Sequence, residues 1–116
     1  MKRELSMVEE QLLDDYYRGL RNIDIYSERI SSYPKGCISK KNIRGCETYY
    51  LQWREGDKVK SKYINRKNLD EVRSMIESRR AGEKNIRSIK EDLRRIERFL
   101  GKELIQSYAN EFRNTI

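Results

Sequence analysis

Apolar residues recur with a helical period over the first quarter of the chain. Their spacings of three, four and seven positions place one stripe along one side of an α-helix. The stripe consists of Val8, Leu12, Tyr16, Leu20, Ile23 and Ile30. Ser6 and Glu9 have the spacing of a capping box, and Pro34 disfavours a helical conformation at Tyr33. The pattern predicts a helix over residues 6–32, within an N-terminal helical segment 1–33.

After residue 36 apolar and polar side chains alternate, which is the period of a β-strand. One predicted face carries Tyr49, Leu51, Trp53, Val59, Ser61 and Tyr63. Gly45 lies in the first predicted turn, and the second turn is a three-residue loop, 55–57. The pattern predicts three antiparallel strands over 37–43, 46–54 and 58–64, within a sheet segment 34–65. We expect Tyr49, Trp53 and Tyr63 to belong to the core.

The apolar side of this sheet needs a cover, because a small sheet with one bare apolar face is not stable alone. Asn65 can cap a helix over 66–81 whose stripe of Leu69, Val72 and Ile76 would pack on the sheet. The phase of the stripe shifts near Gly82, so we expect a break or bend there, with one continuous helix as the alternative.

A last helix is predicted over 83–113 from a short heptad seam. The seam consists of Ile86, Ile89, Leu93, Ile96 and Leu100, followed by Leu104, Tyr108 and Phe112. A helix of that length spans about 45 Å, more than the sheet can cover. The N-terminal helix carries a similar stripe, so the two are expected to pack together, within one chain or across a homodimer. The elements predict an α+β fold in a single domain, 1–116.

The net charge of +7 belongs to one segment of the 116-residue chain. Residues 33–67 contain ten bases and three acids, whereas the remaining sixteen bases and sixteen acids balance. Such a partition focuses positive potential on one part of the molecule.

The sheet face opposite the apolar one is therefore the predicted binding site. We expect it to gather Tyr50, Gln52 and Arg54 with Lys60 and Lys62, joined by Ser39 and Lys41. The full set of predicted nucleic-acid-binding residues is Lys40, Lys41, Arg44, Tyr50, Gln52, Arg54, Lys58, Lys60 and Lys62. Three strands make a ribbon about 10 Å across, comparable to the DNA major groove at about 12 Å. The alternative is a solvated face whose lysines keep the sheet edges from pairing with other sheets.

Residue types exclude several kinds of chemistry. The chain has no histidine and only two cysteines, Cys37 and Cys46, which we interpret as small buried residues. Neither a Gly-rich phosphate loop nor a metal-ligand cluster is present in the sequence, so no enzyme activity, cofactor or metal is predicted. The N-terminus lacks the apolar run of a signal peptide, and no segment is long enough to span a membrane. We expect a cytoplasmic protein with reduced thiols and no membrane partner.

Two resemblances are present. Residues 34–80 contain Gly-x-Ile-Ser, Tyr-Tyr-x-Leu and Lys-Val-x-Ser-x-Tyr in that order, and the segment resembles a family of small uncharacterised bacterial and mobile-element proteins. Members of that family often have several cysteines between the first two strands, whereas only Cys46 lies there in this chain. The layout of three strands followed by a helix is also similar to the arm-site DNA-binding domains of tyrosine recombinases, which implies at most a mode of binding.

These patterns lead to two functional hypotheses. The first is a DNA-binding protein of a bacterium or mobile element that applies the basic sheet to double-stranded DNA, with RNA as a less favoured ligand. The second is a phage-type inhibitor or adaptor that docks on a host nucleic-acid-processing protein, because a basic patch also fits an acidic protein surface.

Overall fold

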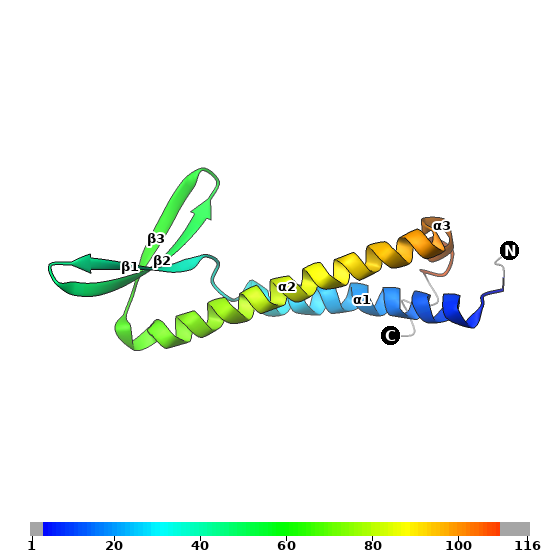
Figure 1. Cartoon of the computed structure of the whole chain (residues 1–116), viewed down its shortest axis with the longest axis horizontal. Coiled ribbons are helices and arrows are strands. Elements are labelled where there is room, and N and C mark those ends of the chain that lie inside the picture. Colours follow the sequence, from blue (N-terminus) through cyan, green and yellow to red (C-terminus); the bar gives the residue numbers. More distant parts are fainter. Residues whose placement is uncertain (1–3, 110–116) are drawn as a thin grey trace. The chain divides into compact units, whose positions relative to one another are not determined.

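A computed structural model describes residues 4–109 of the chain. In chain order three strands come between two long helices, which confirms the α+β fold (Figure 1). The elements are α1 (Met7–Ser31), β1 (Cys37–Ile43), β2 (Cys46–Glu55), β3 (Lys58–Ile64), the 3-10 helix η1 (Arg66–Asn68), α2 (Leu69–Leu100) and α3 (Lys102–Ser107). Within the described residues no helix carries an apolar stretch long enough to cross a bilayer.

The chain divides into two compact units. The described residues 4–28 and 83–109 form one, here called the helical unit, and Arg29–Gly82 form the other, here called the sheet unit. Both α1 and α2 contribute residues to each unit.

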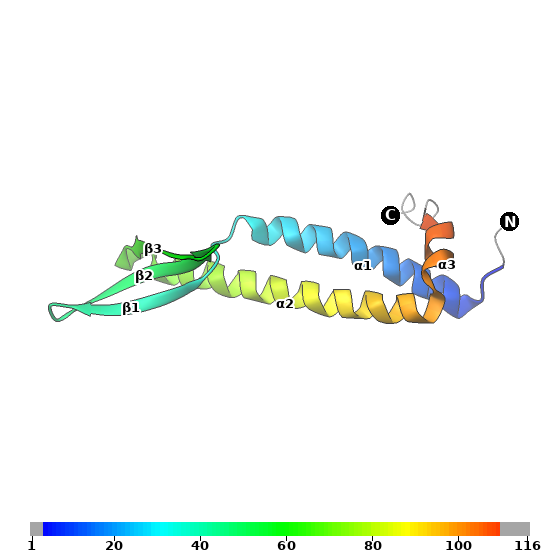
Figure 2. The same ribbon diagram turned by 90° about the horizontal axis from the view of Figure 1, so that it is seen from above.

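In the helical unit α1 and α2 lie side by side, as Figure 1 and Figure 2 both show. The contact is close at Gly19, where an added Cβ would come within 2.8 Å of the Leu93 side chain. The Tyr16 hydroxyl donates a hydrogen bond of 2.9 Å to the Glu97 carboxylate. Of the two predicted arrangements, packing within one chain is therefore present, and a homodimer through these helices stays a prediction.

The predicted capping box at the start of α1 is confirmed. The Glu9 N–H donates to the Ser6 hydroxyl at 3.2 Å, and the Ser6 N–H donates to the Glu9 carboxylate at 3.1 Å. These reciprocal bonds satisfy two of the backbone donors that the first turn of a helix leaves unpaired.

Of the two alternatives at Gly82, the break is wrong and the continuous helix is confirmed. α2 runs without interruption through Gly82 to Leu100, and the break comes at Gly101, which has φ 86°. Few residues other than glycine adopt that conformation, so the seam continues in a separate short helix, α3. The predicted helical residues 110–113 lie outside the described residues.

α3 completes the core of the helical unit. This core consists of Leu13, Tyr17, Ile105 and Tyr108. The buried Tyr17 hydroxyl donates to the Ile105 carbonyl at 2.7 Å, so the core satisfies its polar atom while it buries the ring.

The sheet is an antiparallel meander in the order β1, β2, β3. Residues 49–52 of β2 pair with both neighbours, so the sheet has three strands only there. Beyond this centre two two-stranded ribbons extend, the first ribbon (41–48) and the second ribbon (53–60), and Figure 1 shows that they diverge. Both ribbons are exposed over most of their length.

α2 covers one face of the three-stranded centre. Its buried residues Leu69 and Ile76 belong to the core of the sheet unit together with Ile64 of β3. Asn65 begins this helical segment as predicted, because its side-chain oxygen accepts from the Lys67 N–H at 3.1 Å.

Candidate nucleic-acid interface

Strand register assigns each sheet residue to one of two faces, because directly opposed residues of an antiparallel pair point the same way. The helix-side face carries Ile38, Lys40, Asn42, Glu47, Tyr49, Leu51, Trp53, Glu55, Lys58, Lys60, Lys62 and Ile64. The opposite face, here called the open face, carries Cys37, Ser39, Lys41, Ile43, Cys46, Thr48, Tyr50, Gln52, Arg54, Val59, Ser61 and Tyr63. The open face contains no carboxylate.

The prediction that one sheet face gathers these basic residues is therefore wrong. Lys60 is opposite Trp53 and Lys62 is opposite Leu51, so both lysines lie on the helix-side face. The cause is the second turn, which has two residues instead of three, because Glu55 pairs with Lys58. A slip of one residue moves every side chain of a strand to the other face.

The first turn has the predicted register. Ile43 pairs with Cys46, and Arg44 and Gly45 have φ 53° and 82°, the positive values of a type I′ turn. Lys41 and Ser39 therefore lie on the same face as Tyr50, as expected.

The predicted site residues are thus divided into groups. Lys41, Tyr50, Gln52 and Arg54 lie on the open face. Lys40, Lys58, Lys60 and Lys62 lie on the helix-side face, and Arg44 lies in the first turn. The structure brings together the aromatic and planar polar side chains but separates them from most of the lysines.

A tyrosine pair occupies the centre of the open face. Tyr50 and Tyr63 are directly opposed, with ring centroids 5.9 Å apart and ring planes at 73° in an edge-to-face arrangement. Tyr63 is 59% exposed. The prediction that Tyr63 belongs to the core is wrong, because the same one-residue difference in the register of β3 makes it a surface residue.

A cation adjoins this pair. The Lys41 ammonium lies 5.0 Å from the centroid of the Tyr50 ring, within the range of a cation–π interaction. Arg54, also exposed, lies four positions further along β2 from Tyr50 on the same face. The open face therefore has an aromatic centre with a positive side chain on each side along β2.

The two carboxylates of the ribbon strands, Glu47 and Glu55, lie on the other face and have partners there, and Asp57 lies in the second turn. Lys40 forms an ion pair of 2.8 Å with Glu47, which also accepts from the Tyr49 hydroxyl at 3.2 Å. Hydrogen bonding to Lys40, with its charge, lowers the pKa of Glu47, and the same hydrogen bond and the charge of Glu47 raise the pKa of Lys40. The Trp53 indole N–H donates to Glu55 at 3.0 Å. Acidic charge is thereby held away from the open face.

The whole sheet unit is strongly basic. Residues 29–82 contain fourteen bases and six acids, a net charge of +8, whereas the rest of the chain has twelve bases and thirteen acids. The positive field of the protein therefore originates in the unit that presents the open face.

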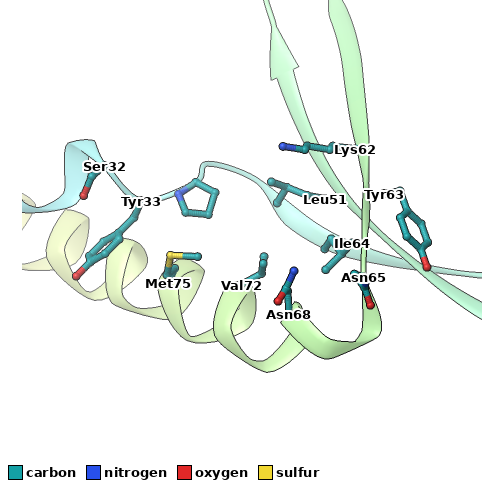
Figure 3. Close-up of a pocket in the computed structure, with 11 residues that line it drawn as sticks. Ser32, Tyr33, Leu51, Lys62, Tyr63, Ile64, Asn65, Asn68, Val72 and Met75 are labelled. Carbon is teal, nitrogen blue, oxygen red and sulfur yellow. The ribbon is translucent and has the colours of Figure 1, made fainter.

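A groove of about 370 Å³ lies between the helix-side face and α2 (Figure 3). Leu51 and Ile64 of the sheet face Val72 and Met75 of α2 across it, and Lys62 stands at its edge. The groove belongs to the packing of helix on sheet, with an apolar lining and one cation at the rim.

Two further expectations were wrong. Cys37 and Cys46 are exposed, because both belong to the open face rather than to the core. Trp53 is only half-buried, because it lies in the second ribbon beyond the three-stranded centre. Among residues 4–109 no three potential metal-ligating side chains are grouped to hold an ion.

Comparison with known proteins identifies the family of the chain. No curated protein and no solved structure matches the chain. A family model described as a domain of unknown function, DUF6788, matches residues 2–74, a range that includes the whole three-stranded sheet and all of α1. Because this match covers more than half of the 116 residues, the chain belongs to the DUF6788 family.

Proposed function

We propose that the protein is a non-catalytic nucleic-acid-binding protein of the cytoplasm and that the open face of its sheet unit makes the contact. The observation that carries this proposal is a sheet face with Lys41, Tyr50, Arg54 and Tyr63 but no carboxylate, in a unit of net charge +8.

Each component of the face has a role in such a contact. Lys41 and Arg54 neutralise phosphates and release the counterions that the polyanion holds. Arg54 carries paired donors, and Gln52 carries a donor and an acceptor, that can recognise base edges. The exposed ring of Tyr63 and the half-buried ring of Tyr50 offer surfaces to bases. The absence of carboxylates from the face removes the repulsion that a phosphate would otherwise meet there.

The two ribbons extend this surface. A two-stranded ribbon is narrow enough to enter the major groove of B-DNA, and both ribbons carry exposed cations. Double-stranded DNA is the ligand predicted from the sequence. With the observed strand register, the ribbons rather than a flat basic face would contact the duplex.

The proposal is tested first by the charge dependence of binding. Purified protein is titrated into a fluorescent oligonucleotide at several salt concentrations, and we expect affinity that falls steeply as salt rises. Lys41→Ala with Arg54→Ala should weaken this binding. The matched control is Lys84→Ala with Lys90→Ala, which removes the same charge from exposed positions of α2 in the helical unit. If neither a single-stranded nor a double-stranded oligonucleotide binds at about 50 mM salt, the proposal is overturned.

Docking on a protein is the second candidate function, and one observation favours it. Ile43 and Val59 on the open face are 47% and 62% exposed, which suits an apolar contact with a protein surface. A pull-down after nuclease treatment discriminates between the two functions. A host protein retained in stoichiometric amount, with no affinity for oligonucleotides, favours the second.

A further inference from the structure

We propose that the ligand of the open face is single-stranded nucleic acid, with unpaired bases stacked on Tyr50 and Tyr63. This inference rests on the nucleic-acid-binding function proposed above and specifies the class of ligand. The relevant juxtaposition is a cross-strand tyrosine pair, with Tyr63 exposed and Tyr50 half-buried, at the part of the sheet where three strands meet.

The position of the pair makes it a platform. Tyr50 belongs to the central strand and is supported by neighbours on both sides, Ser39 of β1 and Tyr63 of β3. The rings lean edge to face at 73°, so they do not cover each other's faces as stacked rings would. Lys41 lies over the Tyr50 ring, so the ring surface left for bases that are not paired belongs mainly to the exposed Tyr63.

Polar and charged groups follow the same line along β2. On the open face the order is Thr48 beside Lys41, then the tyrosine pair, then Gln52 beside Ser61, then Arg54. The seven residues from Thr48 to Arg54 span six rises, about 20 Å, which is enough for a short run of nucleotides. The hydroxyl and amide groups can bond to base edges while Lys41 and Arg54, at the two ends, meet phosphates.

A duplex uses this face less well. Its bases are stacked on each other inside the helix, so tyrosine rings on a sheet have no base face to contact. The lysines of β3 that would follow a duplex backbone beside Gln52 and Arg54 project from the helix-side face instead. Tyrosine stacking and the distribution of charge therefore both favour the single strand.

The test compares three probes by fluorescence anisotropy with the full chain. They are labelled oligothymidylate and oligouridylate of about 16 nucleotides, the upper end of known single-strand site sizes, and a duplex of the same length. We expect either single strand to bind at least tenfold more tightly than the duplex. Equal or tighter binding of the duplex overturns this inference and leaves the proposed function standing, whereas no binding of any probe overturns both.

Substitutions test the role of the rings. Tyr50→Thr and Tyr63→Thr should each weaken single-strand binding by about 5-fold or more, and Tyr50→Phe and Tyr63→Phe should retain it. Tyr49→Thr is the matched control, since Tyr49 is adjacent on β2 but faces α2, and we expect its affinity to stay within about twofold of the unchanged protein. Equal losses in the three threonine variants contradict stacking on the open face.

A second measurement applies if the threonine variants do not fold, which circular dichroism reports. Oligonucleotides that contain 5-bromouracil are photo-crosslinked to the unsubstituted protein, and the modified residues are found by mass spectrometry. Crosslinks at Tyr50 or Tyr63 support the inference. Crosslinks confined to the helix-side face or to the helical unit overturn it.

Discussion

Gly82 of α2 lies directly against Ile30 of α1, and a Cβ added to Gly82 would overlap the Cγ2 atom of Ile30. Both residues are buried in the sheet unit. The glycine that we expected to break α2 is instead a continuous part of the helix, and its missing side chain permits a close approach of two backbones. A glycine in a helix costs about 1 kcal/mol relative to alanine, so its presence here is explained by the contact rather than by helix propensity.

The Gly82–Ile30 contact predicts a reversal of the usual effect of alanine. In an exposed helix Gly→Ala stabilises, but Gly82→Ala should lower the free energy of unfolding by about 1 to 3 kcal/mol through overpacking. Chemical denaturation measures the effect. In an Ile30→Ala background, which removes the overlapping atom, the loss caused by Gly82→Ala should diminish or change sign. A stabilising Gly82→Ala in the unchanged background would contradict the contact.

Two adjacent arginines should differ in their contribution to stability. Arg79 Nη1 donates to the carbonyls of Ile30 at 2.9 Å and Tyr33 at 2.7 Å, where α1 ends, and the bonds are partly buried. Arg80 donates one exposed bond of 3.4 Å to the Gly36 carbonyl. Because hydrogen bonds from charged donors contribute about 1.5 to 3 kcal/mol, Arg79→Leu should cost that amount, whereas Arg80→Leu should cost less than about 0.5 kcal/mol. Equal losses in urea denaturation would contradict this assignment.

Tyr16 should titrate abnormally. Burial, followed by its hydrogen bond to Glu97, raises the pKa of Tyr16 from 10.0 to about 12. NMR of the labelled phenolic carbon should find this value in the native protein. In Glu97→Gln the pKa should fall toward 10 but stay above it, because the effect of burial remains.

The same pKa shift has a consequence for stability. The native state holds the phenolic proton more tightly than the unfolded chain does, so the contribution is complete below pH 10 and is lost as pH rises towards 12. The difference in free energy of unfolding between the unchanged protein and Tyr16→Phe should therefore decrease over this interval. An unchanged difference would contradict the raised pKa.

Charge removed from opposite faces of the sheet should have unequal effects on oligonucleotide binding. Lys41→Ala with Arg54→Ala and Lys60→Ala with Lys62→Ala each remove two charges from the sheet unit, but from the open face and the helix-side face respectively. For a single strand each lost phosphate contact lowers the salt slope by about 0.7, so the first pair should lower it by up to about 1.4. The second pair should change it little. Equal changes would indicate a response to net charge alone.

Local patterns predicted most elements of the structure. The capping box of Ser6 and Glu9, the cap at Asn65 and the first hairpin turn at Gly45 lie where the sequence placed them, because each depends on contacts within a few residues. The predicted helix break at Gly82 is wrong because it depends on a distant residue. Whether a helical glycine ends a helix or admits a neighbour depends on Ile30, which is 52 positions away in the sequence.

The candidate site was predicted in its composition but not in its arrangement. Tyr50, Gln52 and Arg54 share the open face, since alternation within one strand is a property of the strand itself. The place of Lys60 and Lys62 depended on whether the second turn has two residues or three, and both choices fit a Glu-Gly-Asp sequence. The sequence signal for the tyrosine pair is Tyr63, which is directly opposite Tyr50 when the second turn has two residues.

The sequence by itself determined the order of the helices and strands and the concentration of positive charge in residues 33–67, because periodicity and charge are fixed by residue identity. Only the tertiary structure decided which residues meet across β2 and β3, and with that the separation of the tyrosines from the lysines. The physical reason is that strand pairing is settled by competition between whole registers. A difference of one residue in a turn exchanges the two faces of a strand while its local pattern stays the same.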